Sequence, residues 1–316
     1  MFFDISGISK RSNQQYDIII IGGGPAGISA AIYAAQGGLK PLLIEKTIEG
    51  GQMNLTQSIE NYPGIVSIDG SILSKDMAAH ARAFGTEFEF SQVKEILLEG
   101  DTKTVILESK EKITAKVIIV ASGATPRFLG AKNEQNYISK GVSYCASCDG
   151  HFFKHKKIAV VGGGNTAVQE SIFLSKIAHE VVLIHRRDKL RADKIYQDRI
   201  FKISNIRYIW DSQVVEINGS TNVESLTIKN LKDQSIILEK FDGVFIFVGA
   251  TPSTTFLKET VKLDQEGYII TDENMESSVS GIYAVGDVRH KELRQIVTAV
   301  ADGAIAAAHA VRKYFA

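Results

Sequence analysis

The sequence predicts an α/β fold with two doubly wound domains, the second inserted into the first and each carrying a small β-meander. A short apolar strand runs into a glycine cluster twice, over residues 17–24 and again over 157–164. Each cluster is followed by a helical pattern and a second strand, which is the opening unit of a doubly wound parallel sheet. Two copies in 316 residues agree with the length expected for two domains.

Two echoing segments mark the expected joints between the domains. Apolar residues 117–122 end in Gly-Ala-Thr-Pro at 123–126, and 243–248 end in the same four residues at 249–252. We expect the chain to leave the first domain at one joint and to return at the other. The first domain would then comprise residues 1–126 and 253–316, and the second 127–252. Chance repetition of common turn residues is the alternative explanation.

The other elements follow from periodicity and alternation. Second strands are expected at 41–45 and 180–185, and the alanine-rich segment 296–314 predicts a helix. The first meander is expected at 88–98, 104–107 and 112–115. Its counterpart in the second domain is expected over 207–242, where Val215, Ile217, Leu226 and Ile228 alternate with polar residues. Residues 1–15 are expected to form a loose N-terminal arm.

Composition excludes several classes of function. Lys plus Arg and Asp plus Glu are both 36, so the formal charge is zero and no net field attracts nucleic acid or an anionic membrane. Residues 18–35 carry no charge, but their glycine cluster fits a turn better than a membrane span. The first fifteen residues lack the features of a secretory signal. With two cysteines in the chain, a reducing cytoplasm is the expected compartment.

The first glycine cluster has the pattern of a dinucleotide-binding fingerprint. Gly22 would make the tight turn, Gly24 would let the backbone approach a pyrophosphate, and Gly27 would let helix and strand pack closely. Glu45 ends the next strand, where an acid can accept hydrogen bonds from a ribose. The Rossmann-like fingerprint, the strand, the helix and the acid together favour a nucleotide site over a bare structural turn.

The second fingerprint differs from the first at the acid. Gly162 and Gly164 are followed by Ala167 at the third position. The next strand ends in an arginine cluster, Arg186, Arg187 and Arg191. Arginines can grip a 2′-phosphate that an acid would repel, so NADP(H) is the expected nucleotide. A solvated basic turn is the alternative explanation.

The only two cysteines are three residues apart, Cys145 and Cys148, between the two fingerprints. At that spacing they can close a small disulfide or share a metal. The metal alternative is half of a structural zinc site, completed by a dimer mate or by His151 and His155, in a protein that acts as a binding scaffold.

Taken in order, these landmarks resemble the low-molecular-weight, bacterial-type thioredoxin reductases over residues 17–303. Besides both fingerprints and the arginine cluster, the matching motifs are Gly50-Gly51-Gln52, Asn61-Tyr62-Pro63-Gly64, Cys145-x-x-Cys148-Asp149-Gly150, Gly286-Asp287 and Arg294-Gln295-x-x-Thr298-Ala299.

The resemblance implies a homodimeric FAD enzyme that passes electrons from NADPH to thioredoxin, with no nucleic-acid or membrane partner. It implies that Cys145 and Cys148 form a redox disulfide, in which Cys148 is the sulfur nearer the flavin and Cys145 attacks thioredoxin. Asp149 is then the expected proton donor, with capping of a helix as its alternative role.

The implied cofactor residues fall into two groups. Those expected along FAD are Gly22, Gly24, Gly27, Glu45, Gly51, Gln52, Asn61, Gly286, Asp287, Arg294, Gln295 and Ala299. Those expected along NADPH are Gly162, Gly164, Asn165, Thr166, Ala167, His185, Arg186, Arg187 and Arg191.

Two rival activities share this fold. A ferredoxin-dependent reductase should lack the arginine cluster, and a flavin oxidase that closes a dithiol in a small molecule should not need NADPH.

Overall fold

The computed structural model describes residues 15–55, 59–257 and 259–316. Apart from Gln15, the expected N-terminal arm therefore lies outside the described residues. The chain divides into two compact units: unit 1 comprises Met1–Thr125 and Thr251–Ala316, and unit 2 comprises Pro126–Ala250. These limits lie within two residues of the joints expected from the paired Gly-Ala-Thr-Pro segments.

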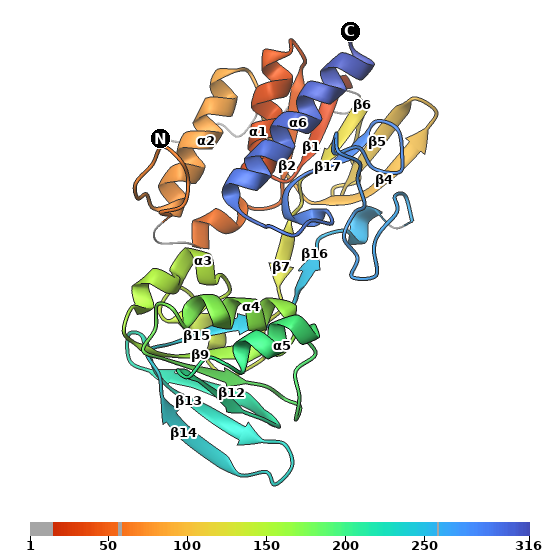
Figure 1. Cartoon of the computed structure of the whole chain (residues 1–316). Coiled ribbons are helices and arrows are strands. Elements are labelled where there is room, and N and C mark those ends of the chain that lie inside the picture. The colour runs from red at the N-terminus through yellow and green to blue at the C-terminus, as the bar shows by residue number, and fades with distance from the viewer. Residues whose placement is uncertain (1–14, 56–58, 258) are drawn as a thin grey trace. The chain divides into compact units, whose positions relative to one another are not determined.

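Unit 1 is built on a seven-stranded sheet of order β3-β2-β1-β6-β5-β4, with β17 pairing to β6 (Figure 1). Strands β3, β2, β1, β6 and β17 pair in parallel, whereas β4, β5 and β6 are antiparallel. The strands are β1 (Gln15–Ile21), β2 (Pro41–Glu45), β3 (Glu87–Phe90), β4 (Val93–Glu99), β5 (Thr102–Leu107), β6 (Lys112–Val120) and β17 (Ile282–Ala284).

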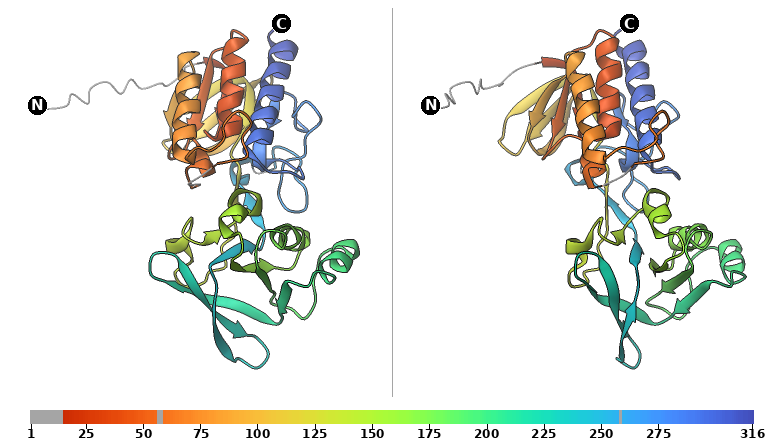
Figure 2. Two further views of the ribbon diagram at one scale, coloured as in Figure 1. Left: turned by 60° about the vertical axis from the view of Figure 1, so that its left-hand side comes forward. Right: turned by 90° about the vertical axis from the view of Figure 1, so that its left-hand side faces the viewer.

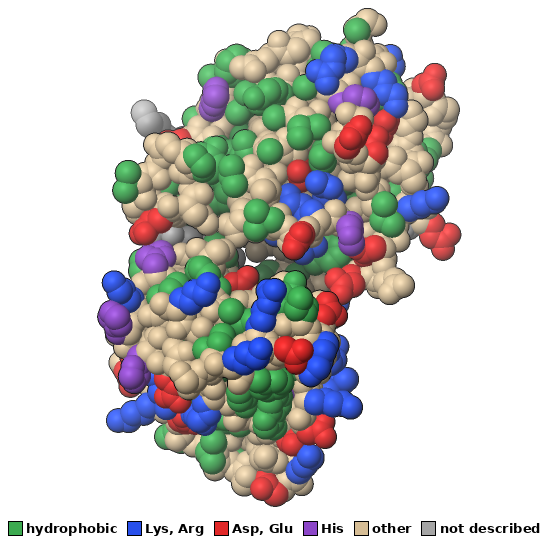
Figure 3. All heavy atoms as spheres, in the orientation of Figure 1, with side chains coloured by type: hydrophobic (Ala, Val, Ile, Leu, Met, Phe, Trp, Pro, Cys, Tyr) green, Lys and Arg blue, Asp and Glu red, His purple; other side chains and the backbone are tan. Residues whose placement is uncertain are grey.

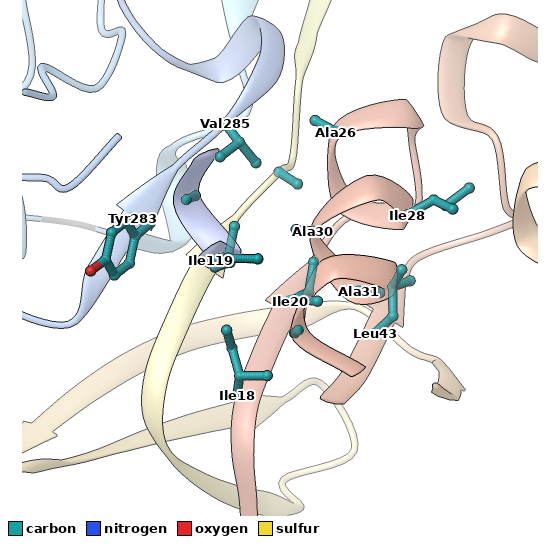
Figure 4. Close-up of a cluster of buried hydrophobic side chains, with 14 of the residues drawn as sticks. Ile18, Ile20, Ala26, Ile28, Ala30, Ala31, Leu43, Ile119, Tyr283 and Val285 are labelled. Carbon is teal, nitrogen blue, oxygen red and sulfur yellow. The ribbon is translucent and has the colours of Figure 1, made fainter. Parts of the chain in front are cut away.

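Three helices cover one face of this sheet: α1 (Pro25–Gln36), α2 (Gly70–Ala83) and α6 (Ile296–Tyr314), side by side in Figure 2. Alternate strand residues face them, so Ile18 and Ile20 are fully buried against the helices (Figure 4). Ile19 and Ile21 point to the opposite face and pack with the β4–β5 hairpin. Each such aliphatic side chain contributes about 1.5–3 kcal/mol when fully buried.

The expected meander of unit 1 is partly wrong. Residues 88–98 form two strands rather than one, because Ser91 donates its N–H to Glu45 of β2 whereas Gln92 accepts from Glu108 beside β5. The chain thus changes partner between β3 and β4. The segments 112–115 and 117–122 instead merge into the single strand β6, whose first half pairs with β5 and whose second half pairs with β17.

Unit 2 has three layers, with a central sheet of order β11-β10-β9-β15-β8. Its helices α3, α4 and α5 pack on one face, and the antiparallel sheet β12-β13-β14 packs on the other. The strands are β8 (Val142–Ser143), β9 (Lys157–Gly162), β10 (Glu180–Ile184), β11 (Ile206–Ile209), β12 (Ser212–Gly219), β13 (Val223–Asn230), β14 (Ile236–Lys240) and β15 (Gly243–Phe247). The helices are α3 (Ala146–Asp149), α4 (Asn165–Leu174) and α5 (Lys194–Ile200).

Two details of the second meander differ from expectation. The strand at 206–209 pairs in parallel with β10, so it belongs to the main sheet. A break in pairing register between Val214 and Glu216 turns Val214 into the core and leaves Val215 partly exposed. Such a bulge adds a residue to one strand, which the alternating pattern alone does not reveal. The expected α/β fold with two doubly wound units, each with a meander, is otherwise confirmed.

The two segments that connect the units pair with each other as β7 (Ala124–Pro126) and β16 (Ala250–Pro252). Residues of the two Gly-Ala-Thr-Pro segments therefore form two short strands that pair with each other. Residues 18–35, whose lack of charge could suggest a membrane span, divide between β1 and α1. Within the described ranges, no helix is long and apolar enough to cross a membrane.

Candidate functional site

Cys145 and Cys148 are joined in a disulfide, with their Cα atoms 5.3 Å apart. Cys145 is the cap of the single-turn helix α3, and its Sγ accepts the N–H of Cys148 at 3.2 Å. The helical turn is what brings residues three apart together. In the part of the chain that the structure describes, no three His, Cys, Asp or Glu side chains are grouped to hold a metal. The bonded sulfurs therefore favour the disulfide over the zinc alternative.

A partly buried carboxyl lies beside the disulfide. Ser143 donates its hydroxyl to Asp149 Oδ2 at 2.6 Å, and its Oγ accepts the N–H of Cys145 at 3.1 Å. Burial raises the pKa of Asp149 above its ordinary value, although the Ser143 hydrogen bond and the His151 charge act in the opposite direction. Asp149 precedes the helical turn η3 (Gly150–Phe153), but its side chain makes no capping hydrogen bond there. An acid that keeps its proton to a higher pH is suited to donate it.

The core of unit 2 fixes the position of the disulfide. Ala146 of α3 is buried in the cluster that contains the sheet face and α4. Phe153, at the end of η3, lies edge-on to Phe245 of β15 with ring centroids 5.2 Å apart. The disulfide is therefore carried by packed elements rather than by a surface loop.

In the first fingerprint, the fold itself requires glycine at positions 22 and 27 but not at position 24. Gly22 has a φ of +112°, and a Cβ on Gly27 would lie 1.9 Å from the carbonyl oxygen of Gly22. Gly24 has an ordinary φ of −75°, and nothing lies within 4 Å of the place its Cβ would take. The chain thus leaves an open cradle at the start of α1, where backbone N–H groups can bind a phosphate.

Glu45 lies against the same glycine turn. Its carboxylate accepts the N–H of Gly23 at 2.7 Å and that of Thr47 at 3.0 Å. Gly51, in the turn η1 (Gly51–Leu55), also reaches the cradle, since a Cβ on it would lie 3.4 Å from Gly24 Cα. The acid expected to bind a ribose is therefore next to the expected phosphate site.

Segments far apart in sequence converge at the start of α6. Asn61 donates its amide to Gln295 Oε1 at 2.9 Å, and residues 60–66 line a pocket of about 500 Å³. A Cβ on Gly286 would lie 2.9 Å from Ala26 Cβ and 3.7 Å from Ala299 Cβ, so Gly286 sits between α1 and α6. Gln52 is placed separately, with its amide bonded to the carbonyl of Ala124.

Two buried polar atoms near this convergence find no hydrogen-bond partner among the described residues: Asp287 Oδ1 and Arg294 Nε. Burial raises the pKa of Asp287, although Lys291 and Arg294 lower it. The Arg294 guanidinium lies 4.2 Å from the centroid of the Tyr268 ring. Buried polar groups normally have partners. An acceptor and a donor left open beside a phosphate cradle fit a bound dinucleotide.

Sequence reasoning missed the residue that holds this turn. Asp302 of α6 is buried and accepts the N–H of Gly286 at 3.0 Å, Arg289 Nε at 3.0 Å and Lys291 Nζ at 2.8 Å. It thereby ties the turn η5 (Gly286–Val288), which contains Asp287, to α6. The sequence did contain a sign of this role, because an Asp is unusual on a helix face whose other residues are alanine and glycine.

The second fingerprint has the same open position. Nothing lies within 4 Å of a Cβ on Gly164, whose φ is −89°. Asn165 exchanges two hydrogen bonds with Asp193, and Arg191 donates its N–H to the carbonyl of Gly163 at 2.7 Å. These bonds bring the segment 191–193 to the start of α4, next to exposed Thr166 and buried Ala167.

The arginine cluster surrounds His185 at the end of β10. Burial lowers the pKa of His185, and the charges of Arg191, Arg187 and Arg186 lower it further. The three arginines are exposed and form no ion pair with any described residue. Three cations without ion-pair partners, beside the open position at Gly164, are suited to bind an anionic group.

Comparison with known proteins agrees with this geometry. The sequence model of the pyridine nucleotide-disulphide oxidoreductase family matches residues 16–303. The chain belongs to this family. It is 47% identical to the thioredoxin reductase of Listeria innocua over 300 residues, which are 95% of this chain and 93% of the relative. It is 45% identical to that of Bacillus subtilis over 295 residues, 92% of each.

Solved structures give the same result. The chain matches the thioredoxin reductase of Streptococcus pyogenes at 47% identity with a TM-score of 0.91, covering 95% of this chain and 98% of that one. It matches the enzyme of Giardia duodenalis at 36% identity with a TM-score of 0.90, covering 95% and 99%. The expected resemblance is confirmed: this member of the pyridine nucleotide-disulphide oxidoreductases is most similar in sequence to bacterial thioredoxin reductases among these relatives.

In this oxidoreductase the open position at Gly164 and the Cys145–Cys148 disulfide both lie in unit 2. Ser143, which links Asp149 to the backbone of Cys145, was not found from the sequence. A serine at the end of a strand carries no motif, so nothing in its sequence context marks it.

Proposed function

We propose that the protein is a thioredoxin-disulfide reductase that carries electrons from NADPH, through FAD and the Cys145–Cys148 disulfide, to thioredoxin. The observation that carries the proposal is a disulfide with a partly buried acid beside it, in the same unit as a nucleotide cradle rimmed by three arginines without ion-pair partners. The names of relatives at 44–47% identity support the choice of thioredoxin as substrate.

FAD would be held in unit 1. The open cradle at Gly24 suits its pyrophosphate. Elsewhere along the cofactor, Arg294 Nε would donate a hydrogen bond and Asp287 Oδ1 would accept one. Glu45 would accept from the ribose, and the segment from Asn61 to Gln295 would border the rest of the cofactor. When bound, FAD supplies two-electron chemistry that connects a nicotinamide to a disulfide.

NADPH would be held in unit 2, with its pyrophosphate at Gly164 and its 2′-phosphate among Arg186, Arg187 and Arg191. Guanidinium groups bind phosphate oxygens with two parallel hydrogen bonds, so losing the 2′-phosphate removes several charge-assisted contacts. We therefore expect a strong preference for NADPH over NADH.

The sulfur chemistry follows from the geometry of α3. An electron pair delivered to the disulfide breaks the S–S bond and leaves two thiols after uptake of two protons. Cys145 as thiolate then attacks the disulfide of thioredoxin, and Cys148 displaces the reduced thioredoxin to reform the original bond. Asp149, protonated to a higher pH than an ordinary Asp, is the group that gives a proton to the departing thiolate.

The division into units sets a constraint on turnover. The disulfide and the NADPH cradle belong to unit 2, whereas the FAD cradle belongs to unit 1. Reacting atoms must approach to about 3–3.5 Å. We propose that nicotinamide and disulfide take turns at the flavin through rotation at the connecting strands β7 and β16.

Two further expectations belong to this proposal. Tyr33, Ile72, Val297 and Ile305 are exposed apolar side chains on the helix layer of unit 1, and Figure 3 shows hydrophobic side chains spread over that face. Exposed apolar surface of this kind marks interfaces, so we propose it as the contact of a homodimer, to be tested by light scattering after size-exclusion chromatography.

A reducing cytoplasm is the compartment that such a dithiol carrier would serve.

The rival activities are separated by one experiment. The purified protein is titrated with NADPH under anaerobic conditions, while flavin absorbance is followed and thiols are counted before and after. We expect bleaching and the appearance of two thiols per chain. Colourless protein that refuses FAD, or sulfurs that stay oxidised, would contradict the proposal. NADPH that fails to bleach bound flavin would favour the ferredoxin-dependent reductase or the dithiol oxidase.

A variant isolates the role of the disulfide. Cys148→Ser should leave NADPH-dependent flavin bleaching intact and abolish thioredoxin reduction, because one sulfur cannot carry an electron pair as a disulfide. Retained thioredoxin turnover in this variant would refute the assignment.

A further inference from the structure

Glu134 is a buried carboxylate that only neutral donors satisfy. It begins the turn η2 (Glu134–Tyr137) and is 3% exposed. Its Oε1 accepts the N–H of Leu129 at 2.9 Å and the hydroxyl of Tyr144 at 2.8 Å, and its Oε2 accepts the N–H of Gly130 at 2.9 Å. It forms no ion pair with a described residue. A buried carboxylate without a cation is costly, so its hydrogen bonds are strongly required.

One of these bonds reaches the residue next to the disulfide. Tyr144 directly precedes Cys145 and follows β8, which pairs with β15. Its ring lies edge-on to Phe128 with centroids 5.8 Å apart, and its hydroxyl is bound by Glu134. Burial, together with the Glu134 contact, raises the pKa of Tyr144, so the hydroxyl remains a donor throughout the working pH range.

We propose that Glu134 and Tyr144 form a positioning clamp that holds Cys145 where its sulfur can bond to Cys148, and thereby sets the equilibrium between disulfide and dithiol. The inference rests on the redox role proposed above for this pair. Helix α3 has only four residues, so it supplies little restraint of its own. Restraint from outside the turn raises the effective concentration of one sulfur for the other, which favours the closed disulfide.

The chemistry of Glu134 explains why a carboxylate is used. Each of its three contacts comes from a donor, and a carboxylate is an acceptor at both oxygens. A glutamine of the same shape would place its NH₂ group against one of these donors. The clamp should therefore be weakened by Glu134→Gln as well as by removal of the Tyr144 hydroxyl.

The test is a glutathione titration of the full flavin-loaded chain, with the fraction of reduced cysteines counted by thiol labelling. In the reaction, two glutathione thiols become one glutathione disulfide while the Cys145–Cys148 bond becomes two thiols. Because these are the only cysteines, the count is unambiguous. Tyr144→Phe deletes one hydroxyl, and Glu134→Gln is the second variant. Tyr137→Phe is the matched control, because its hydroxyl donates to the Gly219 carbonyl at 2.6 Å from the same turn.

We expect the equilibrium constant for disulfide formation to fall about three- to tenfold in Tyr144→Phe and Glu134→Gln, in line with one lost hydrogen bond. A tenfold change corresponds to about 30 mV for two electrons. The equilibrium constant for disulfide formation in Tyr137→Phe should stay within about twofold of the wild-type value. This should hold even if thermal unfolding shows that Tyr137→Phe and Tyr144→Phe lose the same stability.

The clamp would be overturned if the equilibrium constants for disulfide formation in Tyr144→Phe and Glu134→Gln equal that in Tyr137→Phe. If the wild-type pair itself does not open and close with glutathione, the proposed redox function fails first. The two failures are therefore distinguishable within one titration series.

Discussion

Gly24 and Gly164 occupy equivalent places, each at the start of the helix that follows the first strand of its unit. Both have φ values that any residue can adopt, and neither has an atom within 4 Å of the position of a Cβ. The polypeptide itself does not require glycine there. We propose that the space serves a ligand that approaches the backbone, in contrast to Gly27, which the fold itself keeps small.

This contrast predicts a separation of stability from binding. Gly24→Ala and Gly164→Ala should change the free energy of unfolding of the cofactor-free chain by less than about 0.5 kcal/mol. Gly24→Ala should weaken FAD binding about tenfold or more, and Gly164→Ala should raise the KM for NADPH similarly, since a methyl group would take the phosphate's place. Urea unfolding, flavin fluorescence and steady-state kinetics measure the three quantities. Gly27→Ala is the control, and it should destabilise the chain; unaltered FAD binding in Gly24→Ala would contradict the cradle.

Asp149 illustrates how a partly buried acid affects stability. Its pKa is raised in the folded protein, so the fold favours the protonated form. The resulting contribution to stability is present below the ordinary pKa of about 3.8 and is lost as pH rises through the elevated folded value. At neutral pH the ionised Asp149 side chain therefore lowers the stability of the fold.

Asp149→Asn should accordingly be more stable than the wild type at pH 7, and this advantage should shrink as pH falls toward about 4. Urea unfolding of the oxidised protein between pH 4 and 7 measures the difference. Thioredoxin reduction should meanwhile fall about 10²-fold, the usual scale for loss of a general acid. A stability difference that does not vary with pH would exclude an elevated pKa as its cause.

At the scale of elements, the crossing of α1 and α6 organises the part of unit 1 where we propose that FAD binds. A Cβ on Gly303 of α6 would lie 2.2 Å from the carbonyl oxygen of Ala26 and 2.9 Å from the N of Ala30. Ala306, Ala307 and further alanines on this face are also fully buried. The small residues let the helices approach, and that approach places Gly286 between Ala26 and Ala299.

The close crossing predicts a position-specific effect of one side chain. Gly303→Val should cost about 3 kcal/mol or more of unfolding free energy, because the contacting atoms belong to backbone that cannot move aside. Ala301→Val inserts the same residue two positions earlier, where α6 is exposed, and should cost less than about 1 kcal/mol. Chemical denaturation of both variants measures the costs, and equal costs would mean that the crossing tolerates a side chain.

Elements with a strong local signal were predictable from the sequence, and those defined by their partners were not. The helix at 296–314 and both glycine turns follow from short-range pattern. The division of 88–98 into β3 and β4 depends on which strand each half pairs with, and the bulge near Val214 depends on register. Neither property belongs to one segment alone, so the alternating pattern could not reveal it.

The residues of the candidate site also fall into a group that the sequence predicted and a group that it did not. The cysteine pair and the fingerprints are contiguous motifs and were predicted. Ser143, Asp302 and Glu134 act through contacts that link separate segments, such as the bond from Asp302 to Gly286 across sixteen positions. Their residue types are common, so only the folded chain identifies them.

At the scale of the whole molecule, function is divided between two units that are joined by two connections. The proposed FAD cradle belongs to unit 1 and the disulfide to unit 2. Each connection contains a glycine with positive φ, Gly123 at +69° and Gly249 at +107°, next to the paired strands β7 and β16. Glycine tolerates changes in backbone angle that other residues resist, which suits a place where rotation is proposed.

Covalently joining the units should therefore stop the cycle without destroying its parts. A bifunctional lysine reagent, with products selected by peptide mapping for links between 126–250 and the remainder, should abolish steady-state thioredoxin reduction. One half-reaction, either flavin reduction by NADPH or electron transfer to the disulfide, should survive in each linked species. A monofunctional reagent of the same chemistry is the control, and normal cycling by linked protein would rule out alternation.

The pairing of β7 with β16 has a consequence for how such a chain can arise and be altered. Because the segment that leaves unit 1 runs beside the segment that returns to it, a turn of a few residues could bridge the gap if 126–250 were removed. The two strands thus mark a place in the polypeptide at which another domain could be exchanged for unit 2 while unit 1 keeps its own fold.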